Sequence, residues 1–366
     1  MTNNISEVRK LLGQCFFIGF EGLDLSPEVA KFIRENSIGG ITLFANNYES
    51  PAQVAELVNA IQGLKEDLPL IIAVDHEGGR VQRFKKPFTR FPEARVIGDQ
   101  DSPKLAFDCA EIMAKELRTV GVNVVYAPVA DINTNPSNPV IGRRAFGETE
   151  ERVTKIVSAY VRGFLTSKVH PVVKHFPGHG DTSQDSHFHL PKVKTSLQTL
   201  LERETKPFVK AFKSHCEFVM TAHIIVEAIE PKLPATLSKK IIQGILRDQL
   251  RYRGLIVSDD MEMKAVADHF GEVDAPLMAL EAGVNILLYH TMPVQMRVFE
   301  PLLSKLTSPA GAEALRNLKD SAARLAQFKK DHLLPYHPVY IPEIQAIVGA
   351  KEHAQLAKKL EELSIG

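Results

Sequence analysis

Eight short apolar runs recur along the chain, and longer segments with helical spacing separate them. The runs cover residues 15–20, 39–44, 70–75, 122–129, 170–176, 218–223, 255–259 and 284–289. They are apolar on both faces and do not alternate with polar residues, which is typical of parallel strands covered by helices. The pattern therefore predicts eight parallel strands.

The segments between these runs carry signals for the start of a helix. Ser50 and Ser102 are each followed by a proline, which matches an N-cap residue with proline at the first helical position. Ser238 is a candidate N-cap for a third such segment. The regular alternation of strand and helix predicts an α/β fold of the (β/α)₈ TIM-barrel type. A doubly wound open sheet is the structural alternative.

The length and composition of the chain narrow the class of protein. The 366 residues fit one barrel, so we expect the barrel domain over residues 1–332 and a C-terminal extension over 333–366, with no second domain. Lys plus Arg and Asp plus Glu both number 44, which gives no overall field to attract nucleic acid or an anionic membrane.

The N-terminal sequence, the apolar runs and the cysteines bear on where in the cell the protein is found. The N-terminus lacks the basic-then-apolar order of a secretory signal, and no apolar run reaches the ~18–20 residues of a membrane span. The three cysteines are widely spaced and odd in number, unlike a disulfide framework or a CxxC motif. We therefore expect a cytoplasmic protein.

Polar residues stand at the ends of five of the predicted strands. They are Asp75, Asp131, Lys174 with His175, His223, and Asp259. A single residue of this kind could be a cap or a loop residue. In a (β/α)₈ barrel, however, functional groups gather at the carboxyl ends of the strands. The five together therefore indicate a functional site.

The segment KHFPGHGDTSQDSHFHLP, residues 174–191, concentrates four histidines and two aspartates in a loop. Two chemistries compete for it. One is a zinc site, formed by His175, His179, Asp181, His187 and His189. The other is acid/base chemistry, with Asp185 orienting the imidazole of His187 and raising its basicity. The spacing fits no helical HExxH motif and no cysteine assists, which favours acid/base chemistry.

Two more segments carry candidate groups. GLIVSDDMEM, residues 254–263, ends an apolar run in Asp259 and Asp260, and a carboxylate there could form a covalent glycosyl intermediate. The alternative is that one aspartate caps the following helix. In AVDHEGGRVQRF, residues 73–84, Asp75 could accept sugar hydroxyls while an arginine such as Arg83 fixes the carboxylate or a ligand oxygen.

Taken together, these segments resemble glycoside hydrolase family 3, specifically the β-N-acetylglucosaminidases (β-N-acetylhexosaminidases) of bacterial cell-wall recycling. Within residues 14–290 the matching motifs occur in order: VDHEGGRVQR, APVADIN, IGRRAFG, KHFPGHGDTSQDSH, MTAHI, PATLS and GLIVSDDMEM. Other branches of the family lack the DSH portion of the histidine loop. One departure is His76, where the family often has glutamine.

The resemblance implies a retaining, exo-acting enzyme that removes terminal β-linked N-acetylglucosamine from muropeptide fragments or chitooligosaccharides. It implies a covalent intermediate on Asp259, with His187 as acid/base and Asp185 as its dyad partner. The positions that match the sugar-holding set are Asp75, Arg83, Arg144, Lys174, His175 and, less directly, His223. No cofactor, metal, nucleic acid or membrane partner is implied, and we expect a monomer.

Other functions remain open from the sequence. Within the family these are a β-glucosidase or β-xylosidase, against which the DSH loop argues, and a β-N-acetylglucosaminide phosphorylase. A neutral histidine base would repel incoming phosphate less than a carboxylate would, which keeps phosphorolysis open. Outside the family, the alternatives are a zinc hydrolase and a non-catalytic sugar-binding barrel.

Overall fold

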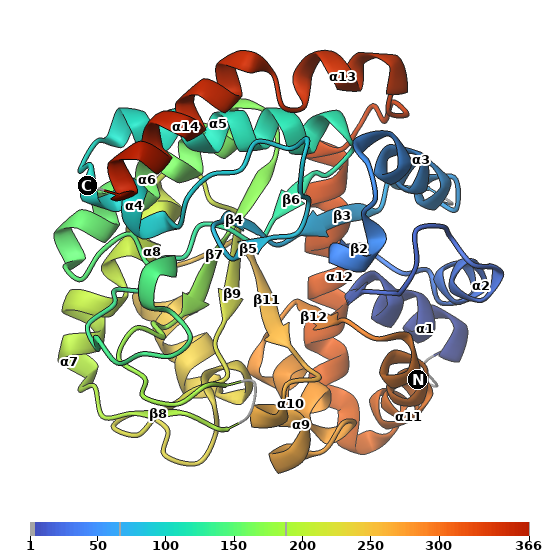
Figure 1. The fold of residues 1–366 in the computed structure, drawn as a ribbon. Helices are drawn as coiled ribbons and strands as arrows, with labels where there is room; N and C mark the ends of the chain where they lie inside the picture. The colour runs from blue at the N-terminus through green and yellow to red at the C-terminus, as the bar shows by residue number, and fades with distance from the viewer. Residues whose placement is uncertain (1–3, 66, 187–188, 366) are drawn as a thin grey trace.

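Eight parallel strands close into a barrel in the computed structural model, which describes residues 4–65, 67–186 and 189–365 (Figure 1). The strands are β1 (Phe16–Ile18), β2 (Gly40–Leu43), β3 (Ile71–Val74), β6 (Val124–Val125), β7 (His170–Phe176), β9 (Phe218–Thr221), β11 (Leu255–Asp260) and β12 (Ile286–Tyr289). The first strand pairs with both β2 and β12, which closes the ring. Each predicted run coincides with one strand, although β11 extends one residue beyond its run. Because the ring closes, the barrel is confirmed and the open sheet is wrong.

The fourth strand is shorter than the predicted run 122–129. The β6 ladder ends at Val125, and Pro128 follows, which has no N–H to offer a ladder. The chain nevertheless stays beside β7, because the Ala130 amide donates to the Lys174 carbonyl at 2.6 Å. This path brings residues 129–133 next to the end of β7.

Helices surround the barrel (Figure 1). They are α1 (Ile5–Gln14), α2 (Pro27–Asn36), α3 (Pro51–Gln62), α4 (Ala94–Asp99), α5 (Pro103–Thr119), α6 (Glu150–Thr166), α7 (Leu197–Thr199), α8 (Lys206–Lys213), α9 (Lys264–Phe270), α10 (Asp274–Ala282), α11 (Met292–Thr307), α12 (Ala312–His332), α13 (Ile344–Ile347) and α14 (Lys351–Ile365). Two short pairs, β4 (His76–Gly78) with β5 (Val81–Gln82) and β8 (Lys192–Val193) with β10 (Ile225–Val226), lie in the loops.

The predicted helix starts are confirmed at Ser50 and Ser102, and at Ser238 the helix that follows is of a different type. Ser50 and Ser102 accept backbone N–H groups of α3 and α5, at 3.2 and 3.3 Å, with proline at the first helical turn. After Ser238 the segment η5 (Lys240–Gln249) winds as a π-helix. Ser238 still accepts the Ile241 amide at 3.3 Å, so its capping role holds while the helix type differs.

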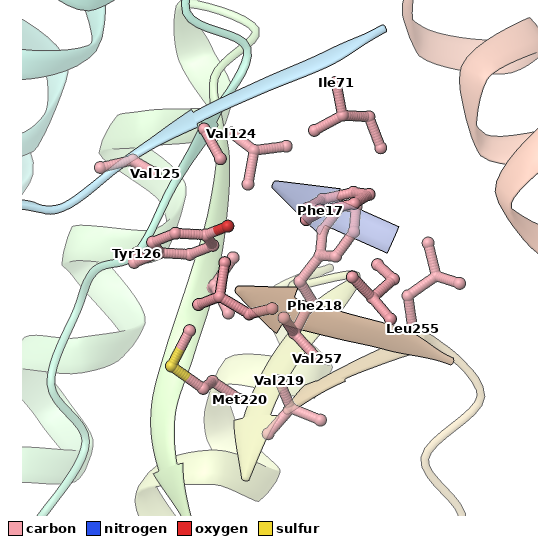
Figure 2. Close-up of a cluster of buried hydrophobic side chains, with 14 of the residues drawn as sticks. Phe17, Ile71, Val124, Val125, Tyr126, Phe218, Val219, Met220, Leu255 and Val257 are labelled. Atoms are coloured by element: carbon pink, nitrogen blue, oxygen red, sulfur yellow. The ribbon is translucent and has the colours of Figure 1, made fainter. Parts of the chain in front are cut away.

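Apolar side chains fill the barrel interior. Figure 2 shows Phe17 of β1 among side chains from the facing strands, including Val124, Phe218 and Val257. These side chains are fully buried, so the barrel is a packed core and not a pore. The interior also holds a polar pair, in which the hydroxyl groups of Thr42 on β2 and of Tyr126 are 2.8 Å apart and share a hydrogen bond.

The C-terminal segment packs on the outside of the barrel. Figure 1 places α13 and α14 along α5, and α14 also contacts α4. Ile344 and Leu360 of this segment are buried. None of the helices in the described part of the chain is both long enough and apolar enough to cross a lipid bilayer.

Candidate active site

A cavity of about 180 Å³ opens at the carboxyl ends of the barrel strands. Its lining comes from strands and loops spread along the chain: Thr42, Phe44, Asp75, Val81, Arg83, Tyr126, Val140, Arg144, Lys174, His175, His179, Ser186, Met220, Asp259, Asp260, Met263 and Leu288. Six predicted site residues belong to it, namely Asp75, Arg83, Arg144, Lys174, His175 and Asp259. A larger cavity of about 440 Å³ lies at the amino end, but none of the predicted site residues that the structure describes lines it.

Lys174 of β7 is the buried centre of an ion-pair network. Its ammonium nitrogen lies 2.7 Å from the Asp75 carboxylate and 2.7 Å from the Glu77 carboxylate. Burial disfavours the charged amine, but the attraction of the two carboxylates outweighs it and raises the pKa of Lys174. The amine is therefore a permanent cation on the cavity wall.

Asp75 follows β3 and is held from two sides. Arg83 donates to it at 3.2 Å, across a β4–β5 hairpin that turns at Gly78 and Gly79, with φ of 99° and 57°. Burial would raise the pKa of Asp75, but Lys174 and Arg83 hold it well below its usual range. The carboxylate is thus charged and fixed in direction at the cavity.

Arg144 also lines the cavity and binds Glu77 through two parallel hydrogen bonds, at 2.9 and 2.8 Å. Burial would raise the pKa of Glu77, yet Arg144 and Lys174 lower it to about 2. Glu77 was not predicted as a site residue. Its position two residues after Asp75, in a segment already marked by glycines and arginines, is the signal that could have identified it.

His175 is oriented by Asp131, which is fully buried. The ring Nδ1 is 2.7 Å from the Asp131 carboxylate, which also accepts the backbone amide of His179 at 2.7 Å. Burial would raise the pKa of Asp131, but His175 and these hydrogen bonds lower it. Because the Asp131 carboxylate accepts the proton on Nδ1, Nε2 is the ring nitrogen left for another contact. The sequence marked Asp131 as a strand-end residue but gave it no role.

Asp259 stands at the end of β11 and lines the cavity. Its carboxylate accepts the Asp260 amide at 2.9 Å. Burial opposes ionisation, but the positive charge that His223, His175 and Lys174 can supply, together with that hydrogen bond, lowers the pKa of Asp259. The group is therefore ionised at neutral pH.

Asp260 has a different setting from its neighbour. Its carboxylate accepts the Glu262 amide at 3.0 Å and lies 2.5 Å from the His290 ring. The next helix, α9, begins only at Lys264. Asp260 therefore closes the turn after β11 and does not cap α9, contrary to the capping alternative.

His223 is the predicted site residue that the structure sets apart. It is fully buried, and it does not belong to the cavity lining. One ring nitrogen contacts the Thr236 hydroxyl at 2.8 Å, and the other contacts the backbone carbonyl of Asp260 at 2.9 Å. The ring thus supports the end of β11 from behind the cavity wall.

The histidine loop is anchored up to Ser186, and His187 lies outside the described residues. His179 contacts Thr182 at 2.8 Å and Ser186 at 3.1 Å, and burial lowers its pKa to about 4. Asp185 is partly buried and is not part of the cavity lining, whereas Ser186 is.

The zinc alternative includes His187, so the described residues place only its other candidate ligands. In the ranges before and after residues 187–188, no set of three candidate ligands converges at His175 or His179. Both rings are instead engaged by hydrogen bonds to side chains. The geometry of the described residues is that of a polar, hydrogen-bonded cavity wall.

His76, the departure from the family motif, packs away from the cavity. Its ring lies 5.9 and 6.0 Å from the rings of Phe84 and Phe88, and burial lowers its pKa to about 4. A neutral ring here fills an aromatic cluster under the β4–β5 hairpin. This side chain therefore does not alter the cavity lining.

The closed (β/α)₈ barrel places ionised carboxylates around a small cavity at its carboxyl end, where barrel enzymes carry their active sites. The family model for the glycosyl hydrolase family 3 N-terminal domain matches residues 7–328, and the chain therefore belongs to glycosyl hydrolase family 3.

The relatives are β-hexosaminidases. The chain is 35% identical to "Beta-hexosaminidase A" of Pseudoalteromonas piscicida, over 92% of this chain and 60% of that protein. It is 37% identical to "Beta-hexosaminidase" of Methylococcus capsulatus, over 80% of this chain and 88% of that protein. The chain thus spans less than two thirds of the first relative and most of the second.

Solved structures agree with the sequence relatives. A family 3 β-N-acetylglucosaminidase from Paenibacillus sp. superposes with a TM-score of 0.86 at 35% identity, covering 97% of this chain and 68% of that one. NagZ from Neisseria gonorrhoeae, in complex with N-trifluoroacetyl-D-glucosamine, gives 0.78 at 27% identity, covering 96% and 98%. The predicted resemblance to the β-N-acetylhexosaminidases of the family is confirmed.

Proposed function

We propose that the protein is a retaining, exo-acting β-N-acetylglucosaminidase that hydrolyses terminal, non-reducing β-linked N-acetylglucosamine. The observation that carries the proposal is the ionised Asp259 carboxylate on a cavity that Asp75 and Lys174 also line. A cavity of about 180 Å³ suits the terminal sugar of a chain and not several sugars at once. The names of the relatives support the same class of substrate.

Asp259 is the nucleophile in this proposal. Its low pKa keeps it charged, so it can attack the anomeric carbon as the glycosidic bond breaks. The bond to the leaving oxygen is replaced by an ester between the sugar and Asp259. Water then hydrolyses the ester and restores the starting anomeric configuration.

His187, supported by Asp185, is the proposed acid/base. It donates a proton to the leaving oxygen in the first step and takes a proton from water in the second. Histidine suits both steps because its ordinary pKa lies near neutrality. The support for this role is the sequence motif, together with the place of Ser186, the residue before it, in the cavity lining.

The remaining lining residues hold the sugar. Asp75 is charged and fixed by Lys174 and Arg83, so it can accept hydrogen bonds from two sugar hydroxyls. His175 offers a second polar contact, oriented by Asp131. Arg144 is tied to Glu77 and acts mainly by neutralising that carboxylate beneath the cavity.

We propose that the natural substrates are muropeptide fragments of the cell wall, following the motifs in the histidine loop. Comparing kcat/KM for N-acetylglucosaminyl-anhydromuramyl compounds and for chitobiose tests this choice. A clear preference for chitobiose would contradict the proposed natural substrate but would leave the proposed β-N-acetylglucosaminidase activity unchanged.

The activity itself is tested with p-nitrophenyl β-N-acetylglucosaminide and the corresponding glucoside, with and without phosphate. We expect hydrolysis of the first substrate alone, with retention of configuration by NMR and with no loss in EDTA. A sugar 1-phosphate product would indicate a phosphorylase, and a preference for the glucoside would indicate a β-glucosidase. Loss of activity in EDTA that added zinc reverses would indicate a zinc hydrolase.

A further inference from the structure

We propose that the amino end of the barrel carries a zinc site formed by His170, Glu217 and His332, at the opposite end from the candidate active site. Ligand atoms of these three residues lie within 4.8 Å of one another. The proposal is independent of the catalytic roles assigned above.

The fold brings the three residues together from distant parts of the chain. His170 is the first residue of β7, Glu217 directly precedes β9, and His332 is the last residue of α12. The two strands are parallel neighbours, so their starts meet at the same end of the barrel. Phe328, one turn before His332 on α12, packs against both imidazole rings at 4.8 Å.

The spacing of the ligand atoms suits a tetrahedral ion. The Glu217 Oε2 atom lies 3.4 Å from His170 Nδ1 and 3.0 Å from His332 Nε2. Zinc bonds of about 2.0–2.1 Å separate tetrahedral ligand atoms by about 3.3 Å. Two imidazoles and one carboxylate are a known zinc ligand set, with water in the fourth position. The two Glu217 distances lie close to this value, and the ligand atoms of the two histidines lie within 4.8 Å of each other.

A second observation points to a missing partner. The Nδ1 atom of His170 is buried and has no hydrogen-bond partner, and the residue is only 5% exposed. A buried polar atom without a partner costs free energy, so such atoms call for an explanation. The Glu217 carboxylate lies 3.4 Å from it, close enough for both groups to bind the same ion. An ion between the two would satisfy the nitrogen.

Solvent access and the state of the ligands favour zinc binding at this cluster over the other cluster of candidate ligands. The side chains of Glu217 and His332 are 39% and 33% exposed, which gives an ion a path from solvent. A second cluster, Asp260, Glu262 and His290, lies on the active-site rim. There Glu262 already accepts hydrogen bonds from two backbone amides and a hydroxyl of residues 290 and 291, so its carboxylate is satisfied without a metal.

The expected role of the ion is structural. It would tie the starts of β7 and β9 to the end of α12. The cavity residues Lys174 and His175 lie roughly 15 Å further along β7, at ~3.3 Å per residue. Zinc at this place should therefore stabilise the fold without taking part in the reaction.

The test titrates metal-free full-length protein with zinc chloride, by calorimetry and by thermal unfolding. We expect one zinc per chain and a rise in Tm. Both should be lost in His332→Gln and Glu217→Gln, with binding weakened about 100-fold or more, because even indirect partners of ligands are worth roughly 10- to 100-fold. Both altered residues are partly exposed, so the variants should fold, and their Tm without zinc checks this.

His290→Gln is the matched control, since it removes the histidine of the other cluster. It should keep the affinity and the rise in Tm. Unchanged zinc binding in His332→Gln and Glu217→Gln would overturn the proposal, as would its loss in His290→Gln alone. An absence of measurable zinc binding by the unaltered protein would overturn it as well.

Discussion

The candidate site is built on charges that cannot easily be kept in a protein interior. Lys174 and Glu77 have only 3% and 5% of their side chains exposed. Removing such ions from water costs several kcal/mol each, and pairing returns that cost only when the geometry is good. Here each charge has two partners, because Lys174 joins Asp75 to Glu77 and Glu77 joins Lys174 to Arg144. The network keeps Asp75 ionised and immobile at the cavity.

Glu77→Gln should therefore lower the free energy of unfolding by about 3–5 kcal/mol at neutral pH, because it leaves the buried Arg144 without its anion and Lys174 with Asp75 alone. In the folded protein, Arg144 and Lys174 overcome burial and depress the pKa of Glu77 from 4.5 to about 2. Its stabilisation is thus complete above pH 4.5 and is lost as the pH falls toward 2. Urea unfolding across this range should show a smaller pH dependence in the variant.

Glu313→Gln is the control for this experiment. Glu313 pairs with Lys239 on the surface, where both side chains are nearly half exposed. Removing such a pair costs at most about 1 kcal/mol. Equal losses of stability in the two variants would contradict the importance of the buried network.

The two neighbouring aspartates of β11 should differ in their effect on turnover. Asp259→Ala should reduce kcat by roughly 10⁴–10⁶-fold, the range seen when a covalent nucleophile is removed. Asp260→Ala should cost much less, because Asp260 holds the turn to Glu262 and contacts His290. Steady-state kinetics, with circular dichroism as a check on folding, measure both. An inactive Asp260→Ala beside an active Asp259→Ala would reverse the assignment.

His187→Ala should slow the enzyme unequally across leaving groups. A nitrophenol needs little protonation, so release from that substrate should be least affected and should appear as a burst while the glycosyl-enzyme accumulates. Natural sugar leaving groups should lose ~10²–10⁴-fold, the usual value of acid–base catalysis. Asp185→Asn should act in the same direction. Uniform loss without a burst would mean that His187 binds the substrate and does not move protons.

At the scale of elements, the loop after β7 depends on close contact with the loop after β6. Asn138 donates to the carbonyls of His179 and Gly180, at 2.8 and 3.1 Å. A Cβ on Gly180 would lie 1.6 Å from the backbone oxygen of Ile132. The two loops can therefore meet in this way only because residue 180 has no side chain.

Gly180→Ala should displace the histidine loop and lower kcat/KM by about 10²-fold, the size of effect expected when positioning is off by about 1 Å. Gly244→Ala is the matched control, because nothing lies within 4 Å of its added Cβ and it sits in the η5 helix. That change should leave activity intact and stabilise by about 0.5–1 kcal/mol. Normal kcat/KM in Gly180→Ala would show that the loop contact is not needed for activity.

At the scale of the whole molecule, the C-terminal segment is fastened to the barrel through Glu116 of α5. Glu116 is 2% exposed and accepts hydrogen bonds from the Thr89 amide, the Gly349 amide and the His353 ring, at 2.8, 3.0 and 2.8 Å. One buried carboxylate thus joins α5, the segment before α4 and the last helix. These hydrogen bonds hold the C-terminal segment against the barrel.

His353→Ala should lower the free energy of unfolding by about 1–3 kcal/mol, because it removes a hydrogen bond to a charged, buried group. Activity on a small substrate should not change, since the cavity lining contains no residue of the C-terminal segment. Lys358→Ala on the exposed face of α14 is the control and should stay within about 0.5 kcal/mol. Chemical denaturation with parallel assays measures both, and equal stability of the two variants would contradict this anchoring.

Local pattern was enough to predict the order of elements. The eight apolar runs each coincide with a barrel strand, and Ser50 and Ser102 cap the helices that they precede. Strand and helix periodicity, and the first hydrogen bonds of a helix, depend on residues only a few positions apart. The polar ends of strands likewise marked Asp75, Lys174 and Asp259 as candidates, because parallel strands bring their carboxyl ends to one side.

Tertiary structure alone decided which of those polar groups meet. Lys174 reaches Asp75 across 99 positions of sequence, and His175 reaches Asp131 across 44. The tertiary structure also places the His223 ring against the backbone of Asp260, outside the cavity lining. It places the Asp260 side chain in a hydrogen bond to the Glu262 amide and brings Glu77 into the ion-pair network. The direction of a side chain and the identity of its charged neighbours follow from the closure and register of the barrel. The sequence therefore determined the strands and their chemistry, whereas barrel closure determined the site.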